Sequence, residues 1–275
     1  MTISEILETA RAGSHPACRV CVWRPQPGLP TAFGVSCVGH GINWHLKAKA
    51  VTFQISQDPA GTTPATTGNL CGLCNSANPT DRSAQQGTQL WQAGVERDSD
   101  VGGGSKFWTR HYWTNAVMHG RSDGRLQAAR SACTAVLRDQ IVALAPRVII
   151  GVGTVAAQSL NDIGFLKQSW PAFRQTLRRA PHCEHATLPN GDVVTVFVTY
   201  HASARSVNQT VAALYADDVE NLLEQRLTLL PTAGEARRFL RHHSAATTPG
   251  RGMRVLLLHW LDIGAAIRAA HGLAA

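Results

Sequence analysis

The sequence predicts an α/β protein: a single-domain, three-layer α/β/α fold with a central four-stranded parallel sheet and a C-terminal helical extension. Two observations support this prediction. Four short apolar runs rich in β-branched residues alternate with longer segments in which apolar residues recur at helical spacing. Strands that alternate with helices form parallel sheets covered on both faces. A chain of 275 residues is long enough to bury such a core.

The predicted strands are short and are bounded by polar or turn-forming residues, as expected for strands in a buried parallel sheet. Because both faces of such a sheet are covered, its strands are continuous apolar runs rather than alternating ones. The four strands are expected at residues 50–55, 112–118, 148–152 and 193–199.

The predicted helices lie between and around these strands. Residues 125–145 repeat apolar side chains on one helical face, and Pro146 ends the pattern. Residues 59–104 are rich in Gly, Thr, Asn, Gln and Ser, which predicts long functional loops that carry a helix. Further helices are expected at residues 3–12, 154–160 and 208–227.

The chain is expected to divide at Pro231. Residues 1–230 would form the α/β domain, and residues 231–275 a helical extension that packs on it, with an apolar helix around 252–271. No apolar run approaches the roughly 20 residues that span a bilayer, and the N-terminus lacks the features of a signal peptide. We therefore expect a cytoplasmic monomer that does not contact membranes.

The charge of the chain favours a polyanionic partner. The sequence has 26 Lys and Arg residues against 18 Asp and Glu residues, a formal net charge of +8. Most of the cations are arginines, whose guanidinium groups match the geometry of phosphate. Nucleic acid is the obvious partner of this kind, although an arginine-rich chain can be basic without one.

Ionisable or amide side chains stand where three of the predicted strands end. Asp58 follows the first strand, Asn115 lies in the second, and His201 follows the fourth. Open α/β sheets bind their ligands at the carboxyl ends of the strands. A carboxylate and an imidazole that are far apart in the sequence therefore predict a two-part catalytic site, and the amide could pair with the edge of a nucleobase.

The segments around these residues resemble the uracil-DNA glycosylase superfamily. Gln57-Asp58-Pro59, Asn115-Ala116-Val117 and His201-Ala202-Ser203-Ala204-Arg205 match three motifs of that family in the correct order, within residues 14–225. The resemblance implies an enzyme that flips deoxyuridine out of DNA and hydrolyses its N-glycosidic bond, releasing uracil and leaving an abasic site. The implied partner is uracil-containing DNA.

The resemblance also implies a role for each matched residue. Asp58 would position the hydrolytic water, and His201 would donate a hydrogen bond to the leaving uracil. Asn115 and Gln57 would bind the base. Arg205 would fill the space that the extruded base leaves in the duplex, because unstacking a base costs a few kcal/mol. Ser203 and Ser206 would then contact DNA phosphates, or they would simply cap a helix.

Two positions depart from the pattern of the family. The aromatic residue that stacks on uracil is replaced by Cys71 or by Asn75, depending on how the loop is aligned. Ala60 stands where the best-known branch has the Tyr that excludes thymine. The residue that covers the base and the source of selectivity against thymine are therefore open, as is selectivity among uracil, hypoxanthine and xanthine.

Four further residues resemble the ligands of the iron–sulfur branch of the same superfamily. They hold a [4Fe–4S] cluster there, and the corresponding residues of this chain are Cys18, Cys21, His119 and Cys133. His119 stands where that branch has a cysteine, and histidine is a ligand in other iron–sulfur centres. A Cys₃His set is also an ordinary zinc site, so zinc is the alternative, and an empty site is a third possibility.

Three other functions fit parts of the sequence. A non-catalytic or tight product-binding iron–sulfur protein that binds DNA could use the same fold. Gly151, Gly153 and Ala156 form a dinucleotide-binding pattern after a strand, but no acidic residue closes a following strand at the spacing that such a site needs. His182 and Glu184 match the start of a zinc deaminase motif whose cysteine pair is missing after residue 184.

Overall fold

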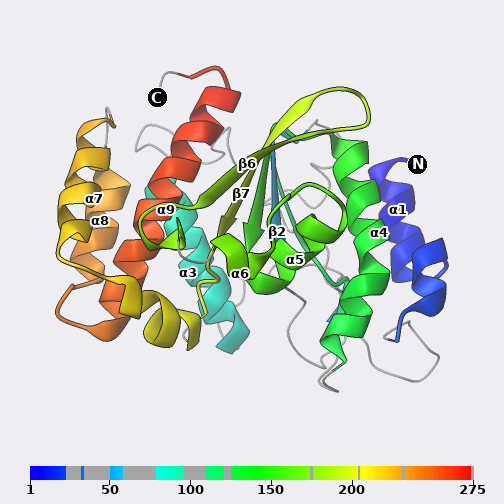
Figure 1. Ribbon diagram of the computed structural model, residues 1–275, viewed down its shortest axis with the longest axis horizontal. Coiled ribbons are helices and arrows are strands. Elements are labelled where there is room, and N and C mark those ends of the chain that lie inside the picture. Colours follow the sequence, from blue (N-terminus) through cyan, green and yellow to red (C-terminus); the bar gives the residue numbers. More distant parts are fainter. Residues whose placement is uncertain are drawn as a thin grey trace. The chain divides into compact units, whose positions relative to one another are not determined.

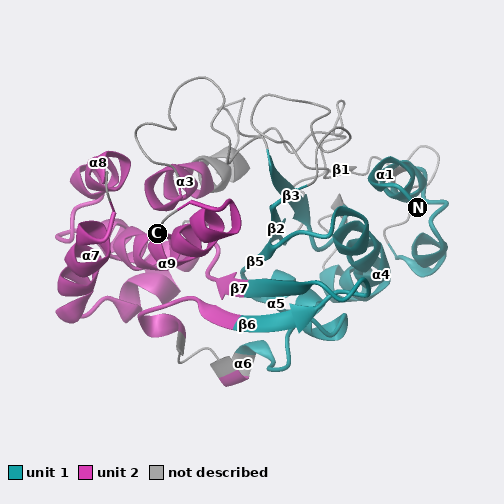
Figure 2. Ribbon diagram, turned by 90° about the horizontal axis from the view of Figure 1, so that it is seen from above, with its two compact units in different colours: residues 1–71, 110–170, 184–196 teal, residues 72–109, 171–183, 197–275 magenta. Residues whose placement is uncertain are grey.

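The computed structural model of the chain consists of two compact units (Figure 2). Unit 1 comprises residues 1–71, 110–170 and 184–196, and unit 2 comprises residues 72–109, 171–183 and 197–275. The boundary predicted at Pro231 stays a prediction, and residues 233–273 fall in unit 2. The structure describes residues 1–22, 32–33, 50–57, 79–95, 110–120, 125–173, 176–203, 205–230 and 233–273.

The main sheet has five strands in the order β3-β2-β5-β7-β6. Figure 2 labels all five strands, and Figure 1 labels β2, β6 and β7. β2 pairs in parallel with β3 on one side and with β5 on the other. The α/β class is therefore confirmed, and all four predicted strands are present. The strands are β2 (Thr52–Ser56), β3 (His111–Asn115), β5 (Val148–Val152), β6 (His182–Thr187) and β7 (Val193–Thr199).

The prediction of four strands was wrong by one, because β6 was not recognised. This strand lies at the end of the sheet order, and the exposure of its residues alternates along it. Its sequence is His-Cys-Glu-His-Ala-Thr, with no large apolar residue. A tight turn joins it to β7, where the Leu188 N–H donates to the Asp192 carbonyl at 2.8 Å. A half-exposed edge strand needs little apolar sequence, so the search for apolar runs missed it.

Three helices pack in unit 1: α1 (Ile3–Arg11), α4 (Leu126–Leu144) and α5 (Thr154–Asp162). α5 contacts β5 and β2, α4 contacts α5, and α1 contacts α4. The apolar face predicted for α4 is buried, and the helix stops before Pro146 at Ala145, whose φ is 42°. This left-handed residue is a common way to end a helix.

Unit 2 contains α9 (Thr248–Ala270), most of whose side chains are buried. α3 (Pro79–Gly94) and α7 (Asp218–Thr228) pack against it, and α8 (Gly234–His242) contacts both α3 and α9. Arg268 is buried and donates to the carbonyls of Gly94 and Val95 at 3.1 and 3.3 Å. The guanidinium therefore gives hydrogen-bond donors to carbonyl groups at the C-terminal end of α3, and its positive charge is favourable at that end of the helix. The predicted C-terminal helix is therefore confirmed and is a core element of unit 2.

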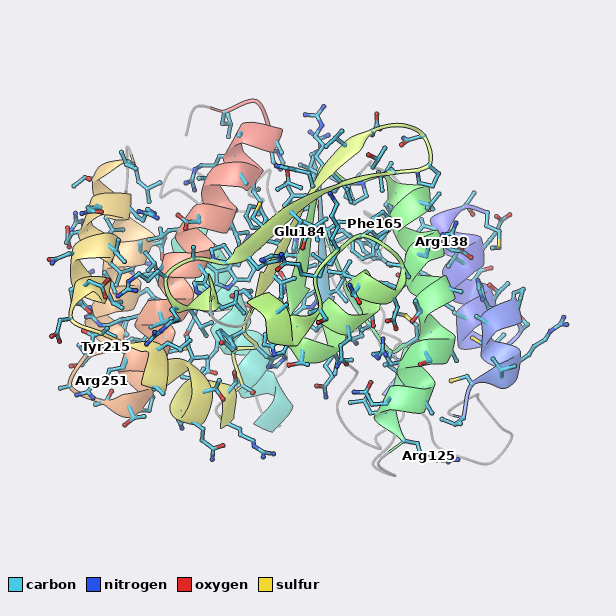
Figure 3. All side chains as sticks on the ribbon, viewed as in Figure 1. Arg125, Arg138, Phe165, Glu184, Tyr215 and Arg251 are labelled. Atoms are coloured by element: carbon cyan, nitrogen blue, oxygen red, sulfur yellow. The ribbon has the colours of Figure 1, made fainter. Side chains whose placement is uncertain are left out.

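The helix predicted over residues 208–227 is broken, which corrects that expectation. Its first part is the π-helical η6 (Ser206–Val211), followed by the 3-10 helix η7 (Ala212–Leu214), and α7 begins only at Asp218. Tyr215 between them has an extended backbone and donates its hydroxyl to Glu220 at 2.6 Å. The Arg251 guanidinium lies 5.9 Å from the centre of the Tyr215 ring (Figure 3). Tyr215 makes these contacts with an extended backbone, a conformation that a continuous α-helix would not allow.

The remaining elements are short. β1 (Ala32–Phe33) pairs with β4 (His119–Gly120) in an antiparallel arrangement. Single helical turns are η1 (Pro16–Val20), α6 (Trp170–Phe173) and η5 (Thr176–Arg178). In the described part of the chain, every helix is too short or too polar to cross a bilayer.

Candidate active site

In unit 1, the parallel pairing of β2 and β3 positions two predicted site residues at the same ends of their strands. Ser56 is the register partner of Asn115. Beyond the strands, the Ala116 N–H donates to the Ser56 carbonyl at 2.8 Å, and the Val117 N–H donates to the Gln57 carbonyl at 3.0 Å. These backbone bonds hold Gln57 beside the Asn115 segment.

Asn115 is buried but not satisfied. It is only 1% exposed, and its side-chain Nδ2 has no hydrogen-bond partner among the residues that the structure describes. Leaving a buried donor unpaired costs about 1–3 kcal/mol, so such groups are rare unless a ligand or water completes them. The amide is thus a fixed, unused donor at the carboxyl end of a strand, where ligands bind in open α/β sheets.

Side-chain hydrogen bonds hold the other residues of β3 in place. The Trp113 indole N–H donates to Ser56 Oγ at 2.8 Å, and the Tyr112 hydroxyl donates to Gln140 Oε1 at 2.9 Å. Gln140 continues this network to the Met118 sulfur at 3.6 Å. Burial raises the pKa of Tyr112 far above its usual range, so the phenol stays protonated and can donate. Buried polar networks of this kind fix one arrangement of a core.

In unit 2, the backbone sets the protonation pattern of His201. The Ser203 N–H donates to His201 Nδ1 at 3.0 Å, so this nitrogen is the acceptor. Burial lowers the pKa of His201 below its ordinary value, which favours the neutral ring at pH 7. A neutral imidazole that accepts at Nδ1 carries its proton on Nε2. His201 is thus prepared to donate one hydrogen bond from Nε2.

The residues predicted to contact DNA follow His201 directly. The Ser206 N–H donates to Ser203 Oγ at 3.4 Å, so Ser203 acts as a cap for one backbone donor at the start of η6, although the residue at the N-cap position itself is Arg205. Arg205 is exposed, whereas Ser203 and Ser206 are partly buried. The cap does not exclude a phosphate contact, because a hydroxyl that accepts a bond from the backbone can still donate its own proton.

Three of the predicted metal ligands lie together in unit 1. Cys18, Cys21 and Cys133 are buried thiols. A hydrogen bond with Cys21, burial and the proximity of Cys18 raise the pKa of Cys133 well above its usual range, while a hydrogen bond with the Met118 backbone opposes this shift. His119, the fourth predicted ligand, follows Met118 in the chain, but its side chain lies outside the described residues.

His15, which no sequence motif points to, caps the start of η1, the helix that carries Cys18. His15 is buried, and its Nδ1 accepts the Ala17 N–H at 3.2 Å. Its Nε2 lies 3.1 Å from Asp139 on α4, the helix that carries Cys133. Such outer contacts orient metal ligands in many proteins. Among the described side chains, however, no group of three or more His, Cys, Asp or Glu residues is arranged to hold a metal ion.

Several predicted residues lie outside the described part of the chain: Asp58, Cys71, Asn75 and Ala60. Glu184, from the deaminase pattern, accepts the backbone N–H groups of Lys167 and Gln168 at 2.8 and 3.4 Å. Figure 3 marks its position on β6. These bonds give the carboxylate a structural role in unit 1, which weakens the deaminase alternative.

A cavity of about 260 Å³ lies in unit 2. No residue predicted for catalysis lines it, and its only described carboxylate, Glu235, is paired with Arg238 at 2.7 Å. We therefore do not assign the reaction to it. Its lining residues belong to α3 and to α8 with the residue that follows it: Gln89, Gln92, Glu235, Arg238, Phe239, His242 and His243.

Comparison with known proteins gives one result, which covers predicted site residues of both units. A family model described as the uracil DNA glycosylase superfamily matches residues 55–224, which is more than half of the chain. The match includes Asn115 and His201 and ends before α8 and α9. A search of curated proteins found no match.

Proposed function

The chain belongs to the uracil-DNA glycosylase superfamily, and from that premise we propose that it excises uracil from DNA. The superfamily domain is one of hydrolases that act on bases in DNA, so the coarser activity follows from membership. The observation that carries the finer proposal is the buried amide of Asn115, whose Nδ2 donor is unused among the described residues. It lies at the carboxyl end of a strand within the matched region.

Asn115 supplies the chemistry for recognising uracil. Its Nδ2 donates to the O4 carbonyl of the base, and its Oδ1 accepts from N3–H. Cytosine presents the reverse pattern at the same edge, so it leaves both amide groups unpaired. A site that is built to pair with a particular edge discriminates strongly against a base that lacks it. The base reaches the site only when it is flipped out of the stack, which costs a few kcal/mol.

His201 stabilises the leaving group. When the bond between C1′ and N1 breaks, its electron pair stays on uracil, and negative charge develops at O2. The neutral ring of His201 donates from Nε2 to this oxygen, and it needs no proton transfer to do so. A preorganised donor aimed at developing charge is worth about 2.7–4 kcal/mol in other enzymes.

Asp58 completes the hydrolysis in this proposal. Its carboxylate orients the water that attacks C1′ and stabilises the positive charge of the oxocarbenium-like sugar. The water oxygen forms the new bond to C1′ and passes its proton to Asp58. The products are an abasic deoxyribose and the uracil anion. The anion takes up a proton from solvent, and Asp58 releases its proton to solvent. This role rests on the match of Gln57-Asp58-Pro59 to the motif of the family.

The contacts around the base and the DNA follow from the same proposal. Backbone near Gln57 assists Asn115, and Cys71 or Asn75 covers the ring. Arg205, which is exposed, enters the space left by the flipped base. Ser203 and Ser206 contact the flanking phosphates.

For the cofactor, we propose that Cys18, Cys21, His119 and Cys133 hold a [4Fe–4S] cluster. The support is the proximity of three buried thiols, a donor type that iron–sulfur clusters and zinc both accept. The cluster would tie η1 to α4 and serve as a structural brace. Purified protein that absorbs near ~400 nm and contains iron and sulfide supports this proposal. Colourless protein that contains one zinc ion per chain would contradict it and would indicate a Cys₃His zinc site.

The proposed reaction is tested with labelled oligonucleotides that carry U, T, hypoxanthine or xanthine, each as a single strand and as a duplex. We expect release of uracil, detected by cleavage at the resulting abasic site. Release of hypoxanthine or xanthine instead of uracil would support a glycosylase that acts on a different base. Tight binding of uracil-DNA without any release would support the non-catalytic alternative.

A further inference from the structure

The C-terminal helix α9 lies outside the matched region but packs against the segment that follows His201. Within unit 2, α9 contacts both η6 and η7. The contact is close at Gly252, where a Cβ atom would lie 2.4 Å from the Val207 carbonyl oxygen and 2.8 Å from a Val207 methyl carbon. Only glycine fits there without displacing the η6 backbone, so α9 fixes the chain just after the His201 turn.

The same helix fixes the chain just before that turn. His259 Nδ1 lies 2.9 Å from the Thr199 hydroxyl, and both side chains are fully buried. The Tyr200 ring is stacked on the His259 ring, with the ring centres 6.3 Å apart and the planes at 26°. Thr199 is the last residue of β7, two residues before His201.

The polar character of this contact is not needed for packing. The neighbours of His259 along α9 are apolar and buried, among them Leu256, Leu258 and Ile263. An apolar pair of similar shape could fill the same space at nearly the same stability, because the net contribution of one hydrogen bond is only about 0.5–1.5 kcal/mol. What a buried polar pair adds is a preference for one arrangement, since moving either side chain breaks the hydrogen bond between them.

The pair also does not act by proton transfer. Burial lowers the pKa of His259 to about 4, so the ring is neutral at the pH at which His201 works as a neutral donor. His259 and Thr199 therefore form a constant, uncharged hydrogen bond. Its geometric effect is to fix the end of β7.

We propose that α9 is a positioning element of the reaction and that His259, through Thr199, is a positioning residue for His201. This inference rests on the proposed function. The turn from Thr199 to Val207 is held at both ends by α9, at His259 and at Gly252, and in the middle by the bond from the Ser203 N–H to His201. A displacement of about 1 Å in a reacting group can lower a rate 10²-fold, so small shifts of this turn would affect catalysis.

The test compares two hydroxyl deletions. Thr199→Val removes the bond to His259. Thr52→Val is the matched control, because Thr52 is also fully buried and hydrogen-bonded to a buried histidine, His111, at 2.6 Å, but at the start of β2. Thr199→Ser keeps the hydroxyl and is the rescue variant. The readouts are the single-turnover rate of uracil release, the Kd for DNA and thermal stability.

We expect Thr199→Val to slow uracil release about 10- to 100-fold with an unchanged Kd. Thr199→Ser should keep most of the rate, and Thr52→Val should lose stability but not rate. Wild-type rates in Thr199→Val, or equal slowing in Thr52→Val, overturn the proposal. If Thr199→Val does not fold, Thr199→Cys keeps the volume, weakens the hydrogen bond and is judged by the same criteria.

A second readout does not depend on the reaction. Amide hydrogen exchange at Ser203 and Val207 should be faster in Thr199→Val than in Thr52→Val. If the wild-type protein releases no uracil, the proposed function fails, and this exchange still decides whether α9 holds the His201 turn. Equal exchange in the two variants would overturn the proposal.

Discussion

Two buried threonine–histidine pairs, one in each unit, have the same chemistry and different positions. Thr52 and His111 are 2.6 Å apart in unit 1, and Thr199 and His259 are 2.9 Å apart in unit 2. Burial lowers the pKa of His111 to about 3 and that of His259 to about 4, so both rings are neutral at pH 7. Thr52 and His111 begin their strands, whereas Thr199 ends its strand.

The difference shows how position along a strand decides what a buried polar pair does. Ligands of open α/β sheets bind at the carboxyl ends of the strands. The pair at the amino ends of β2 and β3 therefore contributes to stability alone. The pair at the carboxyl end of β7 also determines where the next turn, with His201, is placed. The same distinction predicts large effects on the rate at carboxyl ends and effects on stability at amino ends.

The largest effect is expected from removing the two recognition groups at carboxyl ends. Asn115→Ala and His201→Ala should each lower the single-turnover rate of uracil release about 10²–10³-fold, because each deletes a preorganised hydrogen-bonding group. Thr52→Val should leave the rate unchanged. The proposed difference between the two ends of the strands is contradicted if Asn115→Ala or His201→Ala keeps the wild-type rate while its circular dichroism spectrum matches that of the wild type.

The next effect concerns stability as a function of pH. A histidine with a lowered pKa in the folded state binds its proton more readily when unfolded, so it reduces stability as the pH falls below about 6.5. The loss continues to about pH 4 for His259 and about pH 3 for His111. Each ring contributes about 1.4 kcal/mol per pH unit within its window.

Urea unfolding between pH 7.5 and 5 measures this dependence. His111→Gln removes one titrating ring and should flatten the slope. A free energy of unfolding that does not change over this range would contradict the neutral, buried state of both histidines.

A smaller effect is expected at Ser203, which follows His201 but caps η6. Ser203→Ala should lower the free energy of unfolding by about 1 kcal/mol through loss of the cap. Loss of one phosphate contact should also raise the Kd for DNA, by a factor of about 2–10. Fluorescence anisotropy with undamaged duplex DNA measures the second effect. An unchanged Kd would leave Ser203 with its capping role alone.

The sequence predicts the parts of the site that follow from local pattern. His201 follows an apolar, β-branched run that forms β7, and Asn115 closes the aromatic segment that forms β3. β6 could not be found in this way, because its residues are polar and half-exposed. The break at Tyr215 was also missed, because the helical spacing of apolar residues does not show that Tyr215 bonds to Glu220 and lies near Arg251 of α9.

The hydrogen bonds that support the site could not be predicted from sequence patterns, because the partners are far apart in the chain. His259 is 60 residues from Thr199, and His15 is 124 residues from Asp139. A histidine in an apolar helix has no local signal that identifies its partner, because the partner is brought to it only by the tertiary fold. The roles of Asp58, Cys71 and Asn75 stay predictions, as these residues lie outside the described part of the chain.

The most direct test of the whole account is uracil release by the wild-type protein and by Asn115→Asp under single-turnover conditions. This substitution keeps the size of the side chain and replaces the Nδ2 donor with an acceptor oxygen. We expect rapid release of uracil by the wild type and a loss of about 10²-fold or more in the variant. Equal rates for the two proteins, or no release by either from any uracil-containing strand, would contradict it.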